Sequence, residues 1–109
     1  MAQFRASATV DFRANESIPV TSTGAVKLTL SLLQPTDSSV NTVMEYALIS
    51  VETTGTNGPR FYVSGLTADS SGHLTNNNDV VELEGSNNLV NFSAITTGSS
   101  AILRCSYAR

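Results

Sequence analysis

Apolar and polar residues alternate along much of this chain, which is the pattern of β-strands that are buried on one face. The clearest case is the range Ala25–Leu33, AVKLTLSLL, in which Val and Leu side chains alternate with Lys, Thr and Ser. The range Phe4–Phe12 alternates in the same way and places Arg5 and Arg13 on its polar face. We predict a strand over each of these ranges.

Turn residues separate these two strands from several shorter ones. We expect Asn15–Ser17 to turn the chain, and Ile18–Val20 to lie at a sheet edge because Pro19 cannot donate a ladder hydrogen bond. Further strands are predicted at Arg60–Ser64, Asp79–Glu84, Leu89–Ile95 and Ala101–Ala108. Turns are predicted at Thr54–Gly58, Gly85–Asn88 and Thr97–Ser99. Loops are predicted at Gln34–Ser39 and Ala68–Asn78, and we expect the second loop to be exposed.

The range Val40–Val51 fits two structures. Read as a helix, it carries an apolar stripe, and Asp37 or Ser38 would cap it. Read as a strand, it places Ala47 and its alternate neighbours on one face. Its end is rich in β-branched residues and a hairpin signal follows, so we favour the strand and keep the helix as the alternative.

The number and spacing of these segments determine the predicted fold. About eight short strands separated by turns, without a long helical pattern, indicate an antiparallel β-sandwich or jelly roll. At 109 residues the chain has room for one domain, which we place over residues 1–109. The prediction is therefore a single all-β domain.

The charge and the hydropathy of the chain argue against nucleic acid and membranes as partners. The net charge is −3, only 14% of residues are charged, and Lys27 is the one lysine among scattered arginines. Nucleic acid is bound by clustered basic residues, so we expect none here. No apolar run reaches the length of a membrane span, and the first residues lack the pattern of a signal peptide. We therefore expect a soluble protein made in the cytoplasm, with a Ser-, Thr- and Asn-rich surface that suits close packing against a partner.

Residues that could support catalysis are few. His73, Cys105 and Asp69 are the members of the only nucleophile scheme that the chain allows. Cys105 alternates in phase with Leu103 and Tyr107, so it is most simply a buried core residue. The sequence therefore predicts no catalytic residue, and the protein is not expected to be an enzyme.

Two arrangements of carboxylates resemble ligand sites, and neither predicts a ligand. The stretch Asp69–His73 resembles a calcium turn, but it offers one carboxylate where such loops gather several, and an Asx-turn explains it equally well. Glu82 and Glu84 lie two apart on one strand, where same-face acids usually form a solvated edge. We expect neither metal nor cofactor.

A short motif gives the chain a resemblance to known proteins. Residues Leu83–Phe92, LEGSNNLVNF, resemble a strand–turn–strand signature found in discoidin-like β-sandwiches and in small all-β proteins of tailed phages. In that signature Gly85 permits the turn and Phe92 returns to the core. The phage resemblance implies a decoration or cement protein of the virion, made in the host cytoplasm. It also implies the major capsid protein as the partner and a homo-oligomer, a dimer or a trimer.

The N-terminal segment and the first predicted strand are the favoured contact with a partner. A terminal arm can become ordered on a neighbour, and arginine pairs bidentately with carboxylates. The residues of this contact are Gln3, Phe4, Arg5 and Arg13. The alternative is that they form a solvated strand face, in which case we expect the contact on the loops around Asn76 or Asn87.

A carbohydrate-binding β-sandwich module is the alternative function. Asn-rich loops could present amide groups to a sugar, although the chain has no Trp for a sugar ring to stack on. The loops concerned are at Asn57, Asn76–Asn78 and Asn87–Asn88.

Overall fold

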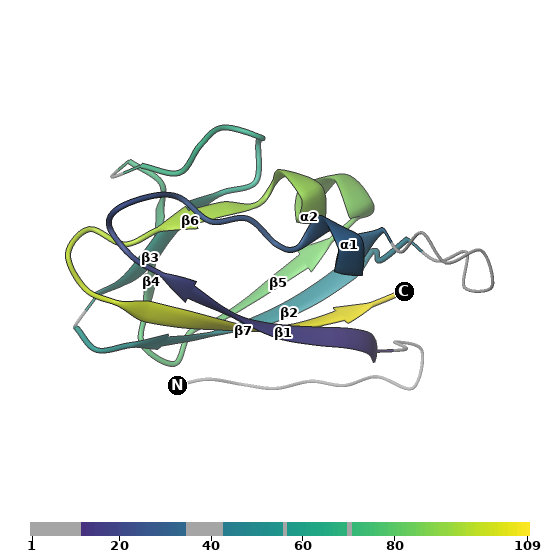
Figure 1. Cartoon of the computed structure of the whole chain (residues 1–109), viewed down its shortest axis with the longest axis horizontal. Helices are drawn as coiled ribbons and strands as arrows, with labels where there is room; N and C mark the ends of the chain where they lie inside the picture. Colours follow the sequence, from purple (N-terminus) through teal and green to yellow (C-terminus); the bar gives the residue numbers. More distant parts are fainter. Residues whose placement is uncertain (1–11, 35–42, 56, 70) are drawn as a thin grey trace.

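Two antiparallel sheets contain all the strands of the described part of the chain, residues 12–34, 43–55, 57–69 and 71–109 of a computed structural model (Figure 1). Sheet A holds, in spatial order, β1 (Phe12–Val20), β7 (Ala101–Ala108), β2 (Tyr46–Thr53) and β5 (Val80–Glu84). Sheet B holds, in spatial order, β4 (His73–Asn76), β3 (Asn57–Tyr62) and β6 (Ser93–Ile95). The short helices are α1 (Leu30–Leu33) and α2 (Ser86–Asn91). The predicted β-sandwich is confirmed.

Alternation along the strands of sheet A builds the core. In β7, Leu103, Cys105 and Tyr107 are buried, and in β2 the same holds for Ala47 and its alternate neighbours. These side chains form one cluster with Leu33, Leu89, Phe92 and Ala94, which come from the helices and sheet B. Burial of apolar area between the layers is the main force that holds them together. The other face of sheet A is called the outer face below.

Strand β1 differs from the prediction in its first half. Residues Asn15–Ser17 do not turn the chain, because β1 pairs with β7 from Phe12↔Ala108 to Val20↔Ala101, interrupted only by an irregularity between Phe12 and Ala14. Pro19 lies in an edge strand, as predicted. The predicted strand Phe4–Phe12 falls almost wholly outside the described residues.

The prediction of a strand over Ala25–Leu33 is wrong. Only Val26 pairs, through two backbone hydrogen bonds to Ala94 that form an isolated bridge. The chain then turns into α1, which buries Leu33 and leaves Leu30 55% exposed. The backbone N–H of Thr29 donates to the Glu16 carboxylate at 3.0 Å, so it is not available to a strand partner.

The segment Val40–Val51, which fitted either a helix or a strand, is a strand from Tyr46 onward, where β2 begins. The predicted faces hold there, but Val43 is exposed and Met44 is buried, so the alternation breaks before Tyr46. The predicted hairpin at Thr54–Gly58 is wrong, because this turn carries the chain from sheet A to sheet B and β3 already begins at Asn57.

The predicted exposed loop at Ala68–Asn78 contains β4. Thr75 is 4% exposed, and its hydroxyl donates to the Pro59 carbonyl at 2.6 Å. Ala68 and Gly72 are buried as well. The polar composition of the stretch concealed a sheet strand, whereas the predicted strand at Asp79–Glu84 is confirmed as β5.

The predicted strand Leu89–Ile95 is a helix followed by a short strand. Helix α2 begins directly after Gly85, whose φ is +95°, and β6 occupies only Ser93–Ile95. Leu89 and Phe92 are both buried, and their spacing of three places them on one side of a helical turn. The strand–turn–strand interpretation of LEGSNNLVNF is therefore wrong, although Phe92 does return to the core.

Figure 1 shows how the connections divide between the two ends of the sandwich. Helices α1 and α2 lie at one end together with the C-terminus and the start of β1; this is the helix end. The β2–β3 and β6–β7 turns lie at the opposite end, the turn end. The two ends carry different surface residues.

Candidate functional site

A carboxylate from the edge strand β1 organises a polar cluster at the edge of the sandwich. Glu16 lies on the inner face of β1 and accepts hydrogen bonds from the hydroxyl of Tyr107 at 2.5 Å and from the hydroxyl of Thr29 at 2.5 Å. The backbone N–H of Thr29 adds a third, at 3.0 Å. Three segments that are distant in sequence therefore meet at one carboxylate, which supports a structural role.

Cys105 adjoins this cluster, since it pairs with Glu16 in the register of β1 and β7. The thiol is 2% exposed and donates to the Leu103 carbonyl at 3.8 Å. Burial raises the pKa of the Cys105 thiol to about 12, and the nearby Glu16 charge acts in the same direction. Burial also raises the pKa of Tyr107. A thiol of this kind is a poor nucleophile at neutral pH.

The structure does not unite the other two members of the nucleophile scheme with Cys105. His73 lies in β4 of sheet B, is exposed, and has its ring 5.4 Å from that of Phe61. Asp69 is exposed and accepts hydrogen bonds from the backbone and the hydroxyl of Ser71, which lower the pKa of this carboxyl. Asp69 thus forms the Asx-turn that was the alternative to a calcium turn. Cys105 faces the core from sheet A.

Metal binding finds no support in the described part of the chain. Within residues 12–34, 43–55, 57–69 and 71–109, no group of three or more His, Cys, Asp or Glu side chains lies close enough to hold an ion. Glu82 and Glu84 are both exposed on β5, an edge strand of sheet A. The Tyr46 hydroxyl donates a hydrogen bond to Glu82 at 2.9 Å, so Glu82 links β5 to β2.

The outer face of sheet A carries an ion pair near its middle. Arg104 on β7 contacts the carboxylate of Glu52 on β2 at 3.1 Å, and both side chains are 52% exposed. Arg104 also donates to the hydroxyl of Ser17 on β1 at 3.0 Å. Three neighbouring strands are thus linked across the solvent side of the sheet.

A hollow lies at the turn end beside this ion pair, and Glu52 belongs to both. A hollow of about 320 Å³ lies between β2 and β7, and its lining residues are Glu52, Thr53, Thr54, Ser100, Ala101 and Ile102. Asn57 and Asn76 are register partners in sheet B, and Asn77 accepts a hydrogen bond from the Thr53 backbone at 3.1 Å. Two of the three Asn-rich loops therefore meet near this hollow. The third, Asn87–Asn88, lies in α2 at the helix end.

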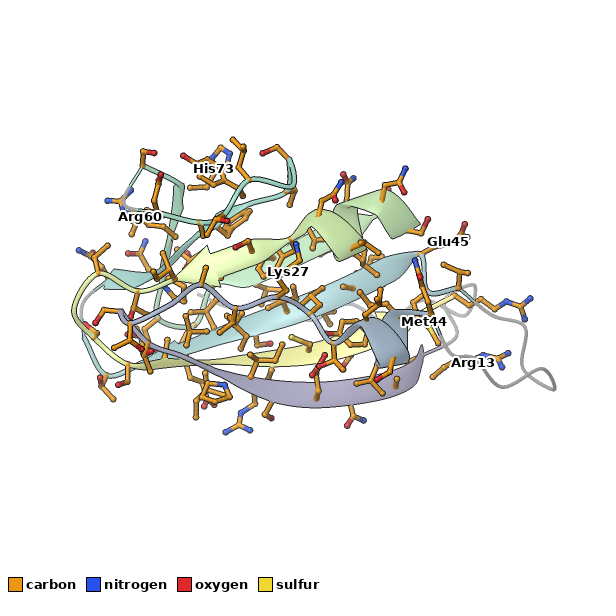
Figure 2. All side chains as sticks on the ribbon, turned by 45° about the horizontal axis from the view of Figure 1, so that its top comes forward. Arg13, Lys27, Met44, Glu45, Arg60 and His73 are labelled. Carbon is orange, nitrogen blue, oxygen red and sulfur yellow. The ribbon has the colours of Figure 1, made fainter. Side chains whose placement is uncertain are left out.

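A second, more open groove lies at the helix end. Its volume is about 370 Å³, and its lining residues are Glu45, Tyr46, Glu84, Gly85 and Arg109. Figure 2 shows Arg13, Met44 and Glu45 at this same end, while His73 and Arg60 lie toward the other. Val43 is 45% exposed here. Of the predicted partner contacts, Arg13 is thus placed on an exposed end, and Gln3, Phe4 and Arg5 lie outside the described residues.

The importance of Glu16 was missed because the sequence placed it in a turn. A usable signal was present, since Glu16 alternates in phase with Ile18 and Val20, both buried. An acidic residue in phase with a buried face requires a donor, and Tyr107 is one of the few available. A strand drawn through Asn15–Ser17 would have pointed to the cluster.

Comparisons with known proteins give no information on the function of this chain. Searches against protein-family models, curated protein sequences and solved structures found no match to this chain. Across the described residues, no helix has both the length and the apolar character needed to cross a membrane.

Proposed function

We propose that this chain is a non-enzymatic structural protein of a phage virion that binds the outer surface of the capsid as a decoration or cement protein. The observation that carries the proposal is that three of its reactive side chains serve the scaffold. Cys105 is buried with a raised pKa, and Asp69 forms its own turn. Glu16 binds Tyr107 and Thr29 between the layers. The remaining surface is suited to contact rather than to chemistry.

The helix end is the surface that we assign to the capsid. It combines an exposed cation, Arg13, with an exposed aliphatic residue, Val43, beside the open groove. Partner surfaces often pair apolar anchors with arginine, because arginine can bind a carboxylate bidentately while its stem packs on apolar groups. Gln3, Phe4 and Arg5 lie outside the described residues, and they belong to the proposed contact on the sequence argument alone.

A protein that binds only assembled shells stabilises them by mass action. Shells of the major capsid protein should therefore survive higher temperature or greater mechanical force once the protein is bound. Equal stability with and without bound protein would contradict the cement role.

A matched pair of variants locates the contact. Arg13→Ala combined with Val43→Asp should weaken binding to shells at least about 10-fold, since it removes a cation and an anchor from the helix end. Lys27→Ala combined with Leu66→Asp makes the same two changes around the small hollow that Lys27 and Leu66 line, and should bind normally. If both variants lose shell binding equally, or if neither loses it, the helix end is excluded as the contact.

A carbohydrate-binding module is the second candidate, favoured by one observation. Asn57, Asn76 and Asn77 gather at the turn end near the hollow between β2 and β7, where amide and hydroxyl groups could bind a sugar. A glycan array probed at about 100 µM protein tests this, since weak sugar sites bind in that range. Blank arrays at that concentration would remove this candidate.

A further inference from the structure

The charges on the outer face of sheet A are divided between its two halves. Among the described outward residues of β1 and β7 there is a cation, Arg104, and no carboxylate. The outward residues of β2 and β5 include Glu52, Glu82 and Glu84 and no cation. Among the described residues, sheet B and both helices pack on the inner face, and Arg104 and Glu52 on the outer face are each 52% exposed.

We propose that this outer face binds a second copy of the chain about a two-fold axis that runs parallel to the strands, between β7 and β2. A two-fold axis in the plane of the interface brings the same surface of both copies together. When that axis is parallel to the strands, β7 of one copy faces β2 of the other, and β1 faces β5. The basic half of each copy then lies on the acidic half of its partner. An in-plane axis perpendicular to the strands would instead place like halves together.

The ion pair between Arg104 and Glu52 lies at the centre of this arrangement. Arg104 is level with Ser50 in the register of β7 and β2, and Glu52 lies two residues further along β2. In the dimer, Arg104 therefore faces Ser50 of the second copy, with that copy's Glu52 on the same side of the strand. Each arginine has a carboxylate in its own chain and another across the axis. Four charges then form a closed network, which stabilises more than separate surface pairs do.

The size of the face sets the strength of the dimer. The strands lie about 4.8 Å apart and rise ~3.3 Å per residue. With nine residues in β1, eight in β7, eight in β2 and five in β5, they span roughly 500 Å² per copy. A dimer would bury on the order of 1,000 Å² in total, which is the lower end for specific interfaces and typical of weak or transient ones. We expect a dissociation constant of roughly 10–100 µM, weakened by salt because the central contacts are ionic.

This inference goes beyond the proposed function, because the dimer forms in solution without a shell. The proposed capsid contact lies at the helix end, whereas the self-interface is centred on Arg104 and Glu52. Measurements of association in the absence of capsids therefore test the dimer alone, and either proposal can fail while the other stands.

The test is a charge-swap experiment read by sedimentation velocity. The wild-type chain should dimerise over about 5–500 µM at low salt, in the range expected for an interface of this size. Arg104→Glu and Glu52→Arg should each weaken dimerisation roughly 100-fold, because each places like charges across the axis twice. Lys27→Glu changes the net charge as Arg104→Glu does but lies away from this face, so it should dimerise normally. Circular dichroism of each variant verifies that it is folded.

Mixing the two single variants provides the decisive result. Each alone is monomeric, but together they should form a heterodimer, because the paired carboxylates of the Arg104→Glu chain meet the paired guanidinium groups of the Glu52→Arg chain. The double variant Glu52→Arg with Arg104→Glu restores complementarity within one chain and should dimerise by itself. A monomeric wild-type chain throughout the concentration range would overturn the proposal. So would a wild-type dimer whose single variants still dimerise, or whose mixed variants stay monomeric.

Discussion

Replacing Glu16 with alanine should destabilise the fold more than the loss of any other described carboxylate. The substitution removes the acceptor of the Tyr107 hydroxyl, and Tyr107 is 0% exposed. A buried hydroxyl left without a partner costs about 1–3 kcal/mol. The two hydrogen bonds from Thr29 are lost as well, but Thr29 is exposed and water replaces much of their value. We expect a loss of about 3 kcal/mol in the free energy of unfolding.

Urea titration measures this loss directly, and thermal unfolding should show a decrease of roughly 13 °C in Tm for a chain of this size. Glu82→Ala is the matched control, since Glu82 also accepts a tyrosine hydroxyl, from Tyr46 at 2.9 Å, but at the exposed outer face. Its expected cost is at most about 1 kcal/mol. Equal costs for the two variants would refute the buried-acceptor reasoning.

A double-mutant cycle separates the Glu16–Tyr107 contact from general effects of the substitutions. Glu16→Gln can keep an oxygen at the Oε2 position, which accepts from both the Tyr107 hydroxyl and the Thr29 N–H, and it places its amide group toward the Thr29 hydroxyl, so its cost should be smaller than that of Glu16→Ala. The cycle built from Glu16→Ala and Tyr107→Phe, each of which removes the contact, should give a coupling energy of about 1–2 kcal/mol. A coupling energy near zero would mean that the two side chains act independently.

Three further predictions concern buried positions: a thiol, a hydroxyl group and a glycine. The pKa of Cys105 is raised to about 12 from 9.0, so its contribution to stability is present below about pH 9 and decreases as the pH rises toward 12. Between pH 8 and pH 10.5 the wild-type chain should therefore lose about 2 kcal/mol more than Cys105→Ala does, by urea titration at both values. Thr96→Val should raise stability by about 1 kcal/mol, because Thr96 Oγ1 is buried without a hydrogen-bond partner among the described residues; an unchanged urea midpoint would argue for a partner there. Gly72→Ala should cost about 1–3 kcal/mol, since its Cβ would lie 3.0 Å from the Phe61 carbonyl oxygen, and a neutral effect on Tm would show that this backbone can move apart.

The sequence was most informative where a strand stays within one sheet. Alternation in Ala101–Ala108 correctly assigned the buried face, including Cys105, and Pro19 correctly indicated an edge. Local periodicity tells which face of a segment is buried, but it does not tell when the chain leaves one sheet for the other. Several errors fall at those crossings, at α1, at α2 and in the turn before β3. Two others lie within a sheet, because polar composition concealed the strand at Asn15–Ser17 and β4.

The candidate surfaces were predicted less completely, for a physical reason. The ion pair between Arg104 and Glu52 joins residues that are distant in the sequence, and it depends on the pairing of β2 with β7. Pairing of distant strands is set by the whole fold, so no local pattern indicates it. The groove at the helix end depends in the same way on the meeting of Glu45, Gly85 and Arg109.

The most direct test of the proposed function is the stoichiometry of binding to capsids. Purified shells of the major capsid protein are titrated with the wild-type chain, sedimented, and the bound protein is quantified. A decoration protein should saturate at a fixed ratio to capsid subunits, and the Arg13→Ala and Val43→Asp variant should need a higher concentration to reach it. Binding that never exceeds the background of an unrelated protein, or that rises without saturation, would contradict the proposal.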